Sequence, residues 1–550
     1  MKNKKYALGM DFGTLSVRVL LINLENGEET AVSVKEYPHG VMDVSLTCGK
    51  KLPADYALQH PSDYIECMIS AIKEVLDISG INAEEIAGIG VDFTACTVIP
   101  VRNDGTPLCL EEKYKNEPHA YVKLWKHHSA AAYADKMAEI AESRKESFLK
   151  YYSGKISSEW LIPKIWEILD ENEALYNDAD KFTEAGDWIT WMLTGKETRN
   201  ACCAGYKATW NAADGYPSKD FLKVLDPRLE NLVADKLSED IYPTGALAGY
   251  VTEKAAKLTG LAKGTPVAVC VIDAHAAFPA SGITTPGKML FIMGTSGCHL
   301  ALSDTDKSYP GICGIVKDGF ISGYYGYEAG QCCFGDHFDW VVKNCMTEEY
   351  IAEARERGIS KHKLLREKAQ KQKPGEHGLL ALDWWGGSRS DLMDSELSGL
   401  ILGMTLTTKP EDIYRALIEA NAYGSRVIVD MFAKADVKID EIYAGGGIAK
   451  KDPFMMQIFA DVLNMPIHIV ESEQAGALGS AMFGAVAGGY FANLDEAAKI
   501  MVKPSEKTYL PIKENSDVYD VIFEEYVKLH DYFAAKDSVI KNMRKIKKQS

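Results

Sequence analysis

Residues 271–299 read VIDAHAAFPASGITTPGKMLFIMGTSGCH, with two apolar runs that are each followed by chemically useful residues. The first run ends at Asp273, and the second, Met289–Met293, ends at Gly294-Thr295-Ser296. Short apolar runs bounded by turn residues are typical of buried strands. A carboxylate at a strand end can accept a proton, and a small-residue turn can bring backbone N–H groups against a phosphate. The stretch therefore predicts a general base and a phosphate-binding hairpin in an α/β fold.

A similar pattern occurs near the start of the chain. Residues 6–24 alternate strand-forming and turn-forming segments, which predicts a hairpin with the polar tip Asp11-Phe12-Gly13-Thr14. One glycine-tipped hairpin in each half indicates a duplicated α/β unit with a ligand cleft between the copies. The candidate phosphate-binding residues of the two tips are Asp11, Gly13, Thr14, Gly294, Thr295 and Ser296, with Asp11 also the candidate ligand of Mg²⁺. Ordinary β-turns remain the alternative, because Asp and Gly are common turn residues.

The composition limits the kinds of partner. At 550 residues the chain exceeds one ordinary core, which predicts two or more domains. A net charge of −17 argues against nucleic acid and anionic membranes as partners. No GxxxxGK[ST] segment occurs, and no GxGxxG follows the first strand, which argues against P-loop and Rossmann nucleotide sites.

Two features of the sequence bear on the compartment. The apolar run at the N-terminus is interrupted at Asp11, too early for a signal peptide, and no other run approaches the length of a membrane span. Twelve cysteines are scattered without a CxxC pair, which is typical of reduced thiols packed as small apolar residues. These features predict a cytoplasmic protein.

Two isolated charges indicate a binding site for a polyol. Lys207 lies in AGYKATW and Glu328 in YYGYEAG, so each charge is surrounded by aromatic and small residues. A buried charge needs a partner, and lysine can donate to sugar oxygens while a carboxylate accepts from sugar hydroxyls. A local salt bridge is the alternative for each. The polar bend 92–97 between two apolar runs leaves room for a ligand, since its residues are small.

Asp273 suits phosphoryl transfer, which needs one carboxylate to accept a hydroxyl proton. At an ordinary pKa of about 4, an aspartate is already ionised at neutral pH. The alternative role is a helix N-cap. Gly445-Gly446-Gly447 follows an apolar run and precedes a helical pattern, so the backbone there can approach a flat ligand such as adenine. A tight strand–helix turn is the alternative for these glycines.

Apolar periodicity predicts several helices around these strands. The strongest patterns cover Pro61–Leu76 with Ser62 as N-cap, Pro410–Phe432, Pro453–Leu463 and Gln474–Ala487.

Two short signatures resemble those of the FGGY family of carbohydrate kinases. Gly399-x-Ile401-x-Gly403-Met404, then after seven residues Asp412-Ile413-x-x-Ala416-Leu417-Ile418-Glu419, is similar to the family's C-terminal signature. Pro163-Lys164-Ile165-Trp166 approximates the N-terminal signature. Further segments extend the resemblance: VDFTACT (91–97), LWKHH (124–128), AGYKATW (204–210), DAHAA (273–277), MGTSGCHL (293–300), YGYEAGQ (325–331) and DWWGGSRS (383–390). Gly297 and Cys332-Cys333 depart from the family pattern.

The resemblance implies a two-domain α/β fold of the actin and hexokinase superfamily, with ribonuclease-H-like cores and with ATP and sugar in the cleft between the domains. It implies a sugar-binding domain at residues 1–284 and a nucleotide-binding domain at 285–550. It also implies site residues: the catalytic base Asp273; the sugar ligands Ala95, Lys207, Asp273 and Glu328; the phosphate and Mg²⁺ positions Asp11, Gly13, Thr14 and Gly294–Ser296; and the adenosine position Gly445–Gly447.

The segments from 91 to 390 resemble most the branch of the family that acts on ribulose. The resemblance therefore implies ATP- and Mg²⁺-dependent conversion of L-ribulose to L-ribulose 5-phosphate, in L-arabinose catabolism. Another substrate, such as D-ribulose, a different pentulose or a pentitol, is one alternative. A non-catalytic, actin-like regulator that binds ATP or sugar is the other. The expected partners are a pentulose and ATP, without nucleic acid or membrane, and a homodimer is the assembly to be tested.

Overall fold

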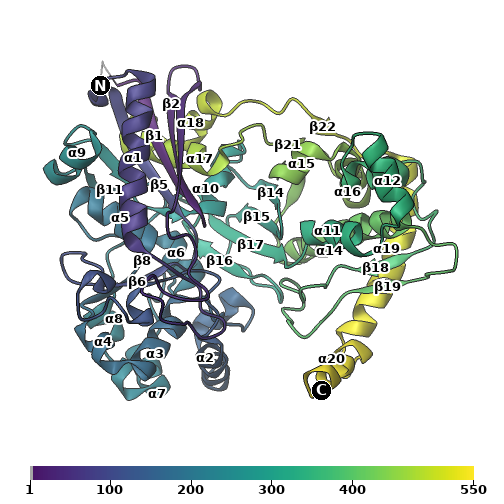
Figure 1. Ribbon diagram of the computed structural model, residues 1–550, viewed down its shortest axis with the longest axis horizontal. Coiled ribbons are helices and arrows are strands. Elements are labelled where there is room, and N and C mark those ends of the chain that lie inside the picture. Colours follow the sequence, from purple (N-terminus) through teal and green to yellow (C-terminus); the bar gives the residue numbers. More distant parts are fainter. Residues whose placement is uncertain (1–3, 550) are drawn as a thin grey trace.

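The computed structural model describes residues 4–549, so the first three residues of the predicted N-terminal domain lie outside it. In Figure 1 the purple-to-teal first half lies on the left and the green second half lies mainly on the right. Each half is built around its own seven-stranded mixed sheet. The predicted α/β class is therefore confirmed.

The first sheet has the order β11-β12-β5-β1-β2-β3, with β13 also paired to β5. Its strands are β1 (Tyr6–Phe12), β2 (Ser16–Asn23), β3 (Glu29–Glu36), β5 (Ile86–Phe93), β11 (Leu247–Tyr250), β12 (Pro266–Ala268) and β13 (Val271–Ile272). β1, β2 and β3 form an antiparallel meander, while β5 is parallel to β1, β12 and β13.

The second sheet has the order β16-β17-β15-β14-β20-β21-β22. Its strands are β14 (Gly287–Met293), β15 (Gly297–Ser303), β16 (Gly314–Lys317), β17 (Tyr325–Gln331), β20 (Ile439–Gly445), β21 (Ile467–Ile469) and β22 (Thr508–Tyr509). β14, β15 and β17 are antiparallel neighbours, while β20 is parallel to β14 and β21. The arrangement repeats that of β1, β2, β3, β5 and β12, which confirms the predicted duplication.

Both glycine-tipped hairpins form as predicted. In the first, the N–H of Gly13 donates to the carbonyl of Ser16 at 3.0 Å. In the second, the N–H of Gly294 donates to the carbonyl of Ser296 at 3.1 Å. Each tip therefore stands at the end of the central antiparallel pair of its own sheet.

One helix of the second half packs on the sheet of the first half. This helix, α17 (Ala475–Ala487), lies beside the purple strands in Figure 1. A Cβ added to Gly9 would lie 1.8 Å from the carbonyl oxygen of Ala477, and one added to Gly90 would lie 1.8 Å from that of Ser480. Only glycine in the strands permits so close a backbone approach, so α17 fits the sheet through small residues.

The other predicted helices form near their expected bounds. They are α1 (Pro61–Ser79), α14 (Pro410–Lys434) and α16 (Pro453–Leu463). The N-cap prediction at Ser62 is wrong, because the ring Nδ1 of His60 accepts the hydrogen bond from the N–H of Ser62 at 3.3 Å. Pro61 suits the first helical position, where no N–H is needed, and this fixes the cap one residue before it.

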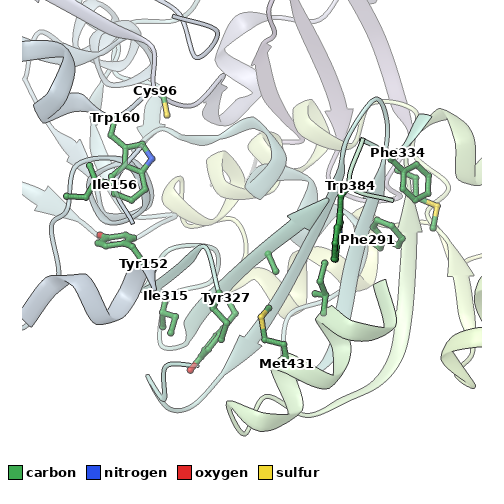
Figure 2. Packing of buried hydrophobic residues seen from close by; sticks show 14 of the residues in the cluster. Cys96, Tyr152, Ile156, Trp160, Phe291, Ile315, Tyr327, Phe334, Trp384 and Met431 are labelled. Carbon is green, nitrogen blue, oxygen red and sulfur yellow. The ribbon is translucent and has the colours of Figure 1, made fainter. Parts of the chain in front are cut away.

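A smaller four-stranded sheet and several helices are inserted in the first half, mainly between β5 and β11, with one strand from the segment between β3 and β5. The sheet has the order β4-β7-β6-β8, from β4 (Leu58–Gln59), β6 (Val98–Val101), β7 (Val122–Lys123) and β8 (Lys181–Glu184). Next to it lie α3 (Leu161–Glu171) and α5 (Ala185–Thr194). Figure 2 shows that one apolar cluster runs from Cys96 and Trp160 in this insertion to Tyr327 and Phe334 in the second half. The insertion therefore shares a core with the second half.

Candidate active site

Three aspartates meet at one edge of the first sheet. Asp11 lies opposite Asp92 in the parallel pair β1–β5, and Val271 of β13 also lies opposite Asp92. Asp273 follows β13 directly, as the first residue of α10 (Asp273–Ala280). Ligands of open parallel sheets bind at the carboxyl ends of the strands, so this edge is the expected position of the chemistry.

Asp273 is a buried carboxylate at the start of α10. Its Oδ1 accepts a hydrogen bond from the N–H of Ala274 at 2.7 Å, which fixes the carboxylate at the helix start. Burial, with the neighbouring charge of Asp11, raises the pKa of Asp273 to about 7. The expectation of an ordinary pKa near 4 is therefore wrong. A base whose pKa lies near neutral pH takes up a proton more readily than an ordinary aspartate does.

Asp92 was not among the predicted site residues. It is fully buried, and its Oδ2 accepts a hydrogen bond from the hydroxyl of Ser480 in α17 at 2.6 Å. Burial and the charge of Asp11 raise its pKa well above the usual range. The sequence places Asp92 near the end of a predicted buried strand. It does not reveal that this strand pairs with β1 in the register that sets Asp92 opposite Asp11.

The three carboxylates give the oxygen donors that suit Mg²⁺. The Oδ2 of Asp11 forms an ion pair with the Arg18 guanidinium at 3.0 Å, so one oxygen of Asp11 has a protein cation beside it. No such ion pair is formed by Asp92 or Asp273 within residues 4–549. Burial and the charge of Asp11 raise the pKa of both neighbouring aspartates, and a divalent cation beside them would favour their ionised forms.

The two predicted sugar ligands contact each other. Lys207, at the end of α6 (Ala201–Lys207), lies 3.2 Å from the Oε2 of Glu328 in β17. The Nη2 of Arg389 lies 2.7 Å from the other carboxylate oxygen, and the Nε2 of His275 lies 3.5 Å from Oε2. Each charge therefore has a salt-bridge partner, but the partner is distant in the sequence and not local as in the alternative interpretation. Since α6 belongs to the first half and β17 to the second, the pair also bridges the two halves.

The charges of Lys207 and Glu328 shift the pKa of Asp273. The Lys207 ammonium lowers the pKa of Asp273 and the Glu328 carboxylate raises it, although burial has the larger effect. Burial alone would raise the pKa of Glu328, but its cationic neighbours, Lys207 first, hold that pKa well below the usual range. Ala95 lies in the bend between β5 and β6 and packs against both apolar clusters that span the halves. The structure thus brings Lys207, Asp273 and Glu328 into one region, and the charge of Lys207 also reaches the thiol of Cys96, the residue after Ala95.

The predicted nucleotide residues of the second half also lie together. Ile292 pairs with Gly445 in the parallel ladder of β14 and β20, so Gly445–Gly447 follow β20 beside the tip Gly294–Ser296. Gly446 has φ +95°, and a Cβ there would lie 2.4 Å from the carbonyl oxygen of Met293. The glycines therefore form the tight strand–helix turn, and a Cβ added to Gly447 would meet nothing within 4 Å, so the backbone there is open.

The tip 294–296 is held from behind by the start of α11 (Gly335–Asn344). The N–H of Gly335 donates to the carbonyl of Gly294 at 3.0 Å, and the N–H of Phe334 donates to that of Thr295 at 2.8 Å. In the first tip, the Thr14 hydroxyl accepts a hydrogen bond from the Trp125 indole at 3.2 Å. Both tips are therefore held in place by hydrogen bonds from neighbouring segments.

Two protein-family patterns match the chain over most of its length. The pattern of the FGGY family of carbohydrate kinases, N-terminal domain, matches residues 6–278, and that of the C-terminal domain matches residues 289–488. The chain belongs to the FGGY family of carbohydrate kinases. This FGGY kinase is 53% identical to a protein named ribulokinase from Bacillus licheniformis, over 97% of this chain and 98% of the relative. It is 51% identical to one from Halalkalibacterium halodurans, over 99% and 98%.

Solved structures of the FGGY fold resemble the kinase as well. A xylulose kinase from Rhodospirillum rubrum aligns with a TM-score of 0.80 at 23% identity, over 96% of this chain and 98% of the other. Plasmodium falciparum glycerol kinase with ADP aligns with a TM-score of 0.74 at 16% identity, over 95% and 98%. These likenesses confirm the predicted two-domain kinase fold.

Two other features of the FGGY kinase follow from the structure. Gly297, which departs from the family pattern, begins β15, and a Cβ there would lie 3.0 Å from the Phe291 ring, so packing favours glycine. Arg389 lies in the quoted segment DWWGGSRS, but its contact with Glu328 was not predicted. The isolated Glu328 carboxylate indicated that a cationic partner is needed, because a buried carboxylate requires one, but the sequence did not show that Arg389 is that partner.

Within residues 4–549, no helix combines the length and the apolar character that crossing a membrane requires. All twelve cysteines lie within the same residues, and each is a free thiol.

Proposed function

We propose that this chain transfers the γ-phosphoryl group of ATP to the 5-hydroxyl of L-ribulose, giving L-ribulose 5-phosphate and ADP. The observation that carries the choice of sugar is the identity of about half of all residues, over nearly the whole length, to proteins named ribulokinase. The aspartate with a pKa near neutrality, beside the Lys207–Glu328 pair, supports phosphoryl transfer to a sugar hydroxyl.

In the proposed reaction, Asp273 accepts the proton of the 5-hydroxyl as the new O–P bond forms and the bond to ADP breaks. Lys207 and Glu328 bind sugar oxygens and hydroxyls, and Ala95 borders the sugar. The backbone N–H groups of Thr14, Thr295 and Ser296 donate to the phosphates, while those of Gly13 and Gly294 close the two hairpins. When bound near Asp11, Mg²⁺ supplies positive charge to the phosphate oxygens.

In the proposed function, each half binds one of the two substrates. Residues 1–284 bind the sugar, residues 285–550 bind the nucleotide through Gly445–Gly447, and closure of the halves excludes water that would otherwise hydrolyse ATP. Free thiols throughout the described chain support a cytoplasmic location. A homodimer is the proposed assembly, which sedimentation of the purified chain would test.

A coupled assay of ADP release across pentuloses and pentitols tests the function. L-Ribulose is expected to give the highest kcat/KM. A higher kcat/KM with D-ribulose, another pentulose or a pentitol would replace the sugar but keep the enzyme class. Binding of ATP without any sugar-dependent ADP release would contradict the kinase proposal and favour a non-catalytic regulator.

The rate is expected to depend on pH through Asp273. The base is active as the carboxylate, so protonation below its pKa of about 7 lowers kcat/KM for L-ribulose, by about tenfold per pH unit well below the pKa. Profiles of kcat/KM from about pH 5 to 9 measure this effect. A wild-type profile that stays flat down to about pH 5 would contradict the raised pKa.

Lys207→Met is expected to weaken sugar binding selectively. A hydrogen bond to a charged group contributes about 1.5–3 kcal/mol, so KM for L-ribulose should rise about 10- to 100-fold. KM for ATP should stay within a few-fold, because Arg389 remains beside Glu328 and the nucleotide residues are untouched. Lys317→Met, in the neighbouring strand β16, is the matched control, since its ammonium donates to the carbonyl of Gly323 instead. Equal changes in the two variants would contradict a sugar contact.

A further inference from the structure

The bend between β5 and β6 contains one peptide unit that two buried charges hold from opposite ends. On one side, the ammonium of Lys164 donates to the carbonyl of Cys96 at 2.6 Å. On the other side, the N–H of Thr97 donates to the Oε2 of Glu184 at 2.8 Å. The C=O and the N–H of the Cys96–Thr97 peptide therefore point to a cation and an anion, respectively.

These two charges are unusual in having no ion-pair partner. Lys164 is fully buried and Glu184 is 3% exposed, yet neither forms an ion pair within 4 Å in residues 4–549. The two charges attract each other only across the peptide that lies between them. The other hydrogen bonds of Lys164 go to the carbonyls of Leu124 at 2.9 Å and Lys123 at 3.4 Å. Burying an unpaired charge is costly. A neutral side chain would fill either position at lower cost, so the charges indicate a need for strong hydrogen bonds to this peptide.

The local backbone explains that need. Cys96 has φ +57°, in the left-handed region that a residue with a side chain seldom adopts. Such a conformation persists only where the surroundings hold it in place. Figure 2 shows Cys96 beside Trp160, the residue just before α3, and Lys164 follows one turn later on that helix. β8 supplies Glu184 and places it opposite Val98. Two separate elements thus fix the strained residue.

The rest of the bend is tied to the same frame. The Thr97 hydroxyl lies 2.8 Å from the carbonyl of Thr94 and 3.1 Å from that of Ala95. The N–H of Thr94 donates to the carbonyl of Phe12 at 3.1 Å, next to the first hairpin tip. Displacement of the Cys96–Thr97 peptide would therefore move Ala95 relative to Lys207, whose charge already acts on the Cys96 thiol.

We propose that Lys164 and Glu184 are positioning residues, which clamp the Cys96–Thr97 peptide and so hold Ala95 in place against the pentulose. This inference rests on the proposed function, since Ala95 has a role only if the bend borders the sugar. It assigns a purpose to Lys164 in the segment that approximates the N-terminal family signature. It also predicts that the clamp affects the sugar and not the nucleotide, because neither charge contacts residues 294–296 or 445–447.

The test compares Lys164→Met and Glu184→Gln with the wild-type chain. Lys164→Met keeps the length of the side chain and removes the charge, and KM for L-ribulose is expected to rise about tenfold or more. Glu184→Gln keeps an acceptor for the Thr97 N–H and should give a smaller rise. KM for ATP should stay within about twofold in both variants. If Lys164→Met does not fold, the KM for L-ribulose of Glu184→Gln alone decides the test.

Arg415→Met is the control for a structural effect. Arg415 is also a buried cation that donates to backbone carbonyls, those of Ala369 and Gln372, but it lies in the second half. It should lower the melting temperature without raising KM for L-ribulose. An unchanged KM for L-ribulose in the clamp variants, or equal rises for sugar and ATP, would overturn the proposal. Absence of pentulose-dependent ADP release in the wild type would instead overturn the proposed function, and the clamp with it.

Discussion

Asp273→Asn is expected to lower kcat by about 10²- to 10⁴-fold, the usual contribution of a general base. The asparagine side chain has the same shape but cannot accept the hydroxyl proton. KM for L-ribulose should change little, because Lys207 and Glu328 remain to bind the sugar. Steady-state kinetics with both substrates measure these quantities, and isothermal titration with L-ribulose measures binding directly.

The folded state should tolerate this substitution. Because the pKa of Asp273 is raised in the folded chain, its ionised form destabilises the fold above the ordinary carboxylate pKa, and the neutral amide removes that effect. Asp495→Asn is the matched control, as Asp495 lies in the first turn of α18 (Leu494–Met501), where it pairs with Lys499. The control should keep wild-type turnover. Turnover of Asp273→Asn within a few-fold of wild type would refute its role as base.

Gly90→Ala is expected to be among the most destabilising single-methyl additions in the chain. The new Cβ would lie 1.8 Å from the carbonyl oxygen of Ser480, and this obstacle is helix backbone, which cannot rotate away. Overpacking usually costs about 1–3 kcal/mol, and a clash with backbone belongs at the upper end or beyond. Ser480 also donates to Asp92, so displacement of α17 would disturb the carboxylates as well. Both stability and kcat are expected to fall.

Urea unfolding of Gly90→Ala measures the loss of stability, with Gly80→Ala as its control. Gly80 ends α1 at φ +65°, and a Cβ there meets nothing within 4 Å. Its substitution therefore reports only the backbone strain of a side chain in the left-handed conformation, about 1–2 kcal/mol. A loss in Gly90→Ala no larger than in Gly80→Ala would show that α17 does not pack as tightly as described.

Local patterns of the sequence predicted much of the fold. The bounds of α16 match the prediction, because Pro453 fixes its start and its apolar period is strong. The echo between the two hairpins predicted the duplicated sheets. In contrast, the contact of Ser480 with Asp92 joins residues 388 positions apart, and no local pattern carries such a pairing. The packing of α17 on the first sheet was therefore beyond prediction.

The candidate site was predicted by residue type more than by environment. Asp273 was selected from its position after a strand, but its pKa depends on burial and on Asp11, which only the tertiary structure supplies. Likewise, the isolated charges of Lys207 and Glu328 were visible in the sequence, whereas their pairing across the halves was not.

The place of α17 in the chain affects how the protein folds during synthesis. The strands of the first sheet are complete once β13 has left the ribosome, but the helix that covers their glycine-lined face follows roughly 200 residues later. At about 5–20 residues per second, that delay is about 10–40 seconds. During this interval the newly made sheet has an uncovered apolar face. Slow translation of the second half would lengthen that exposure, and chaperones that bind apolar surface would be needed most then.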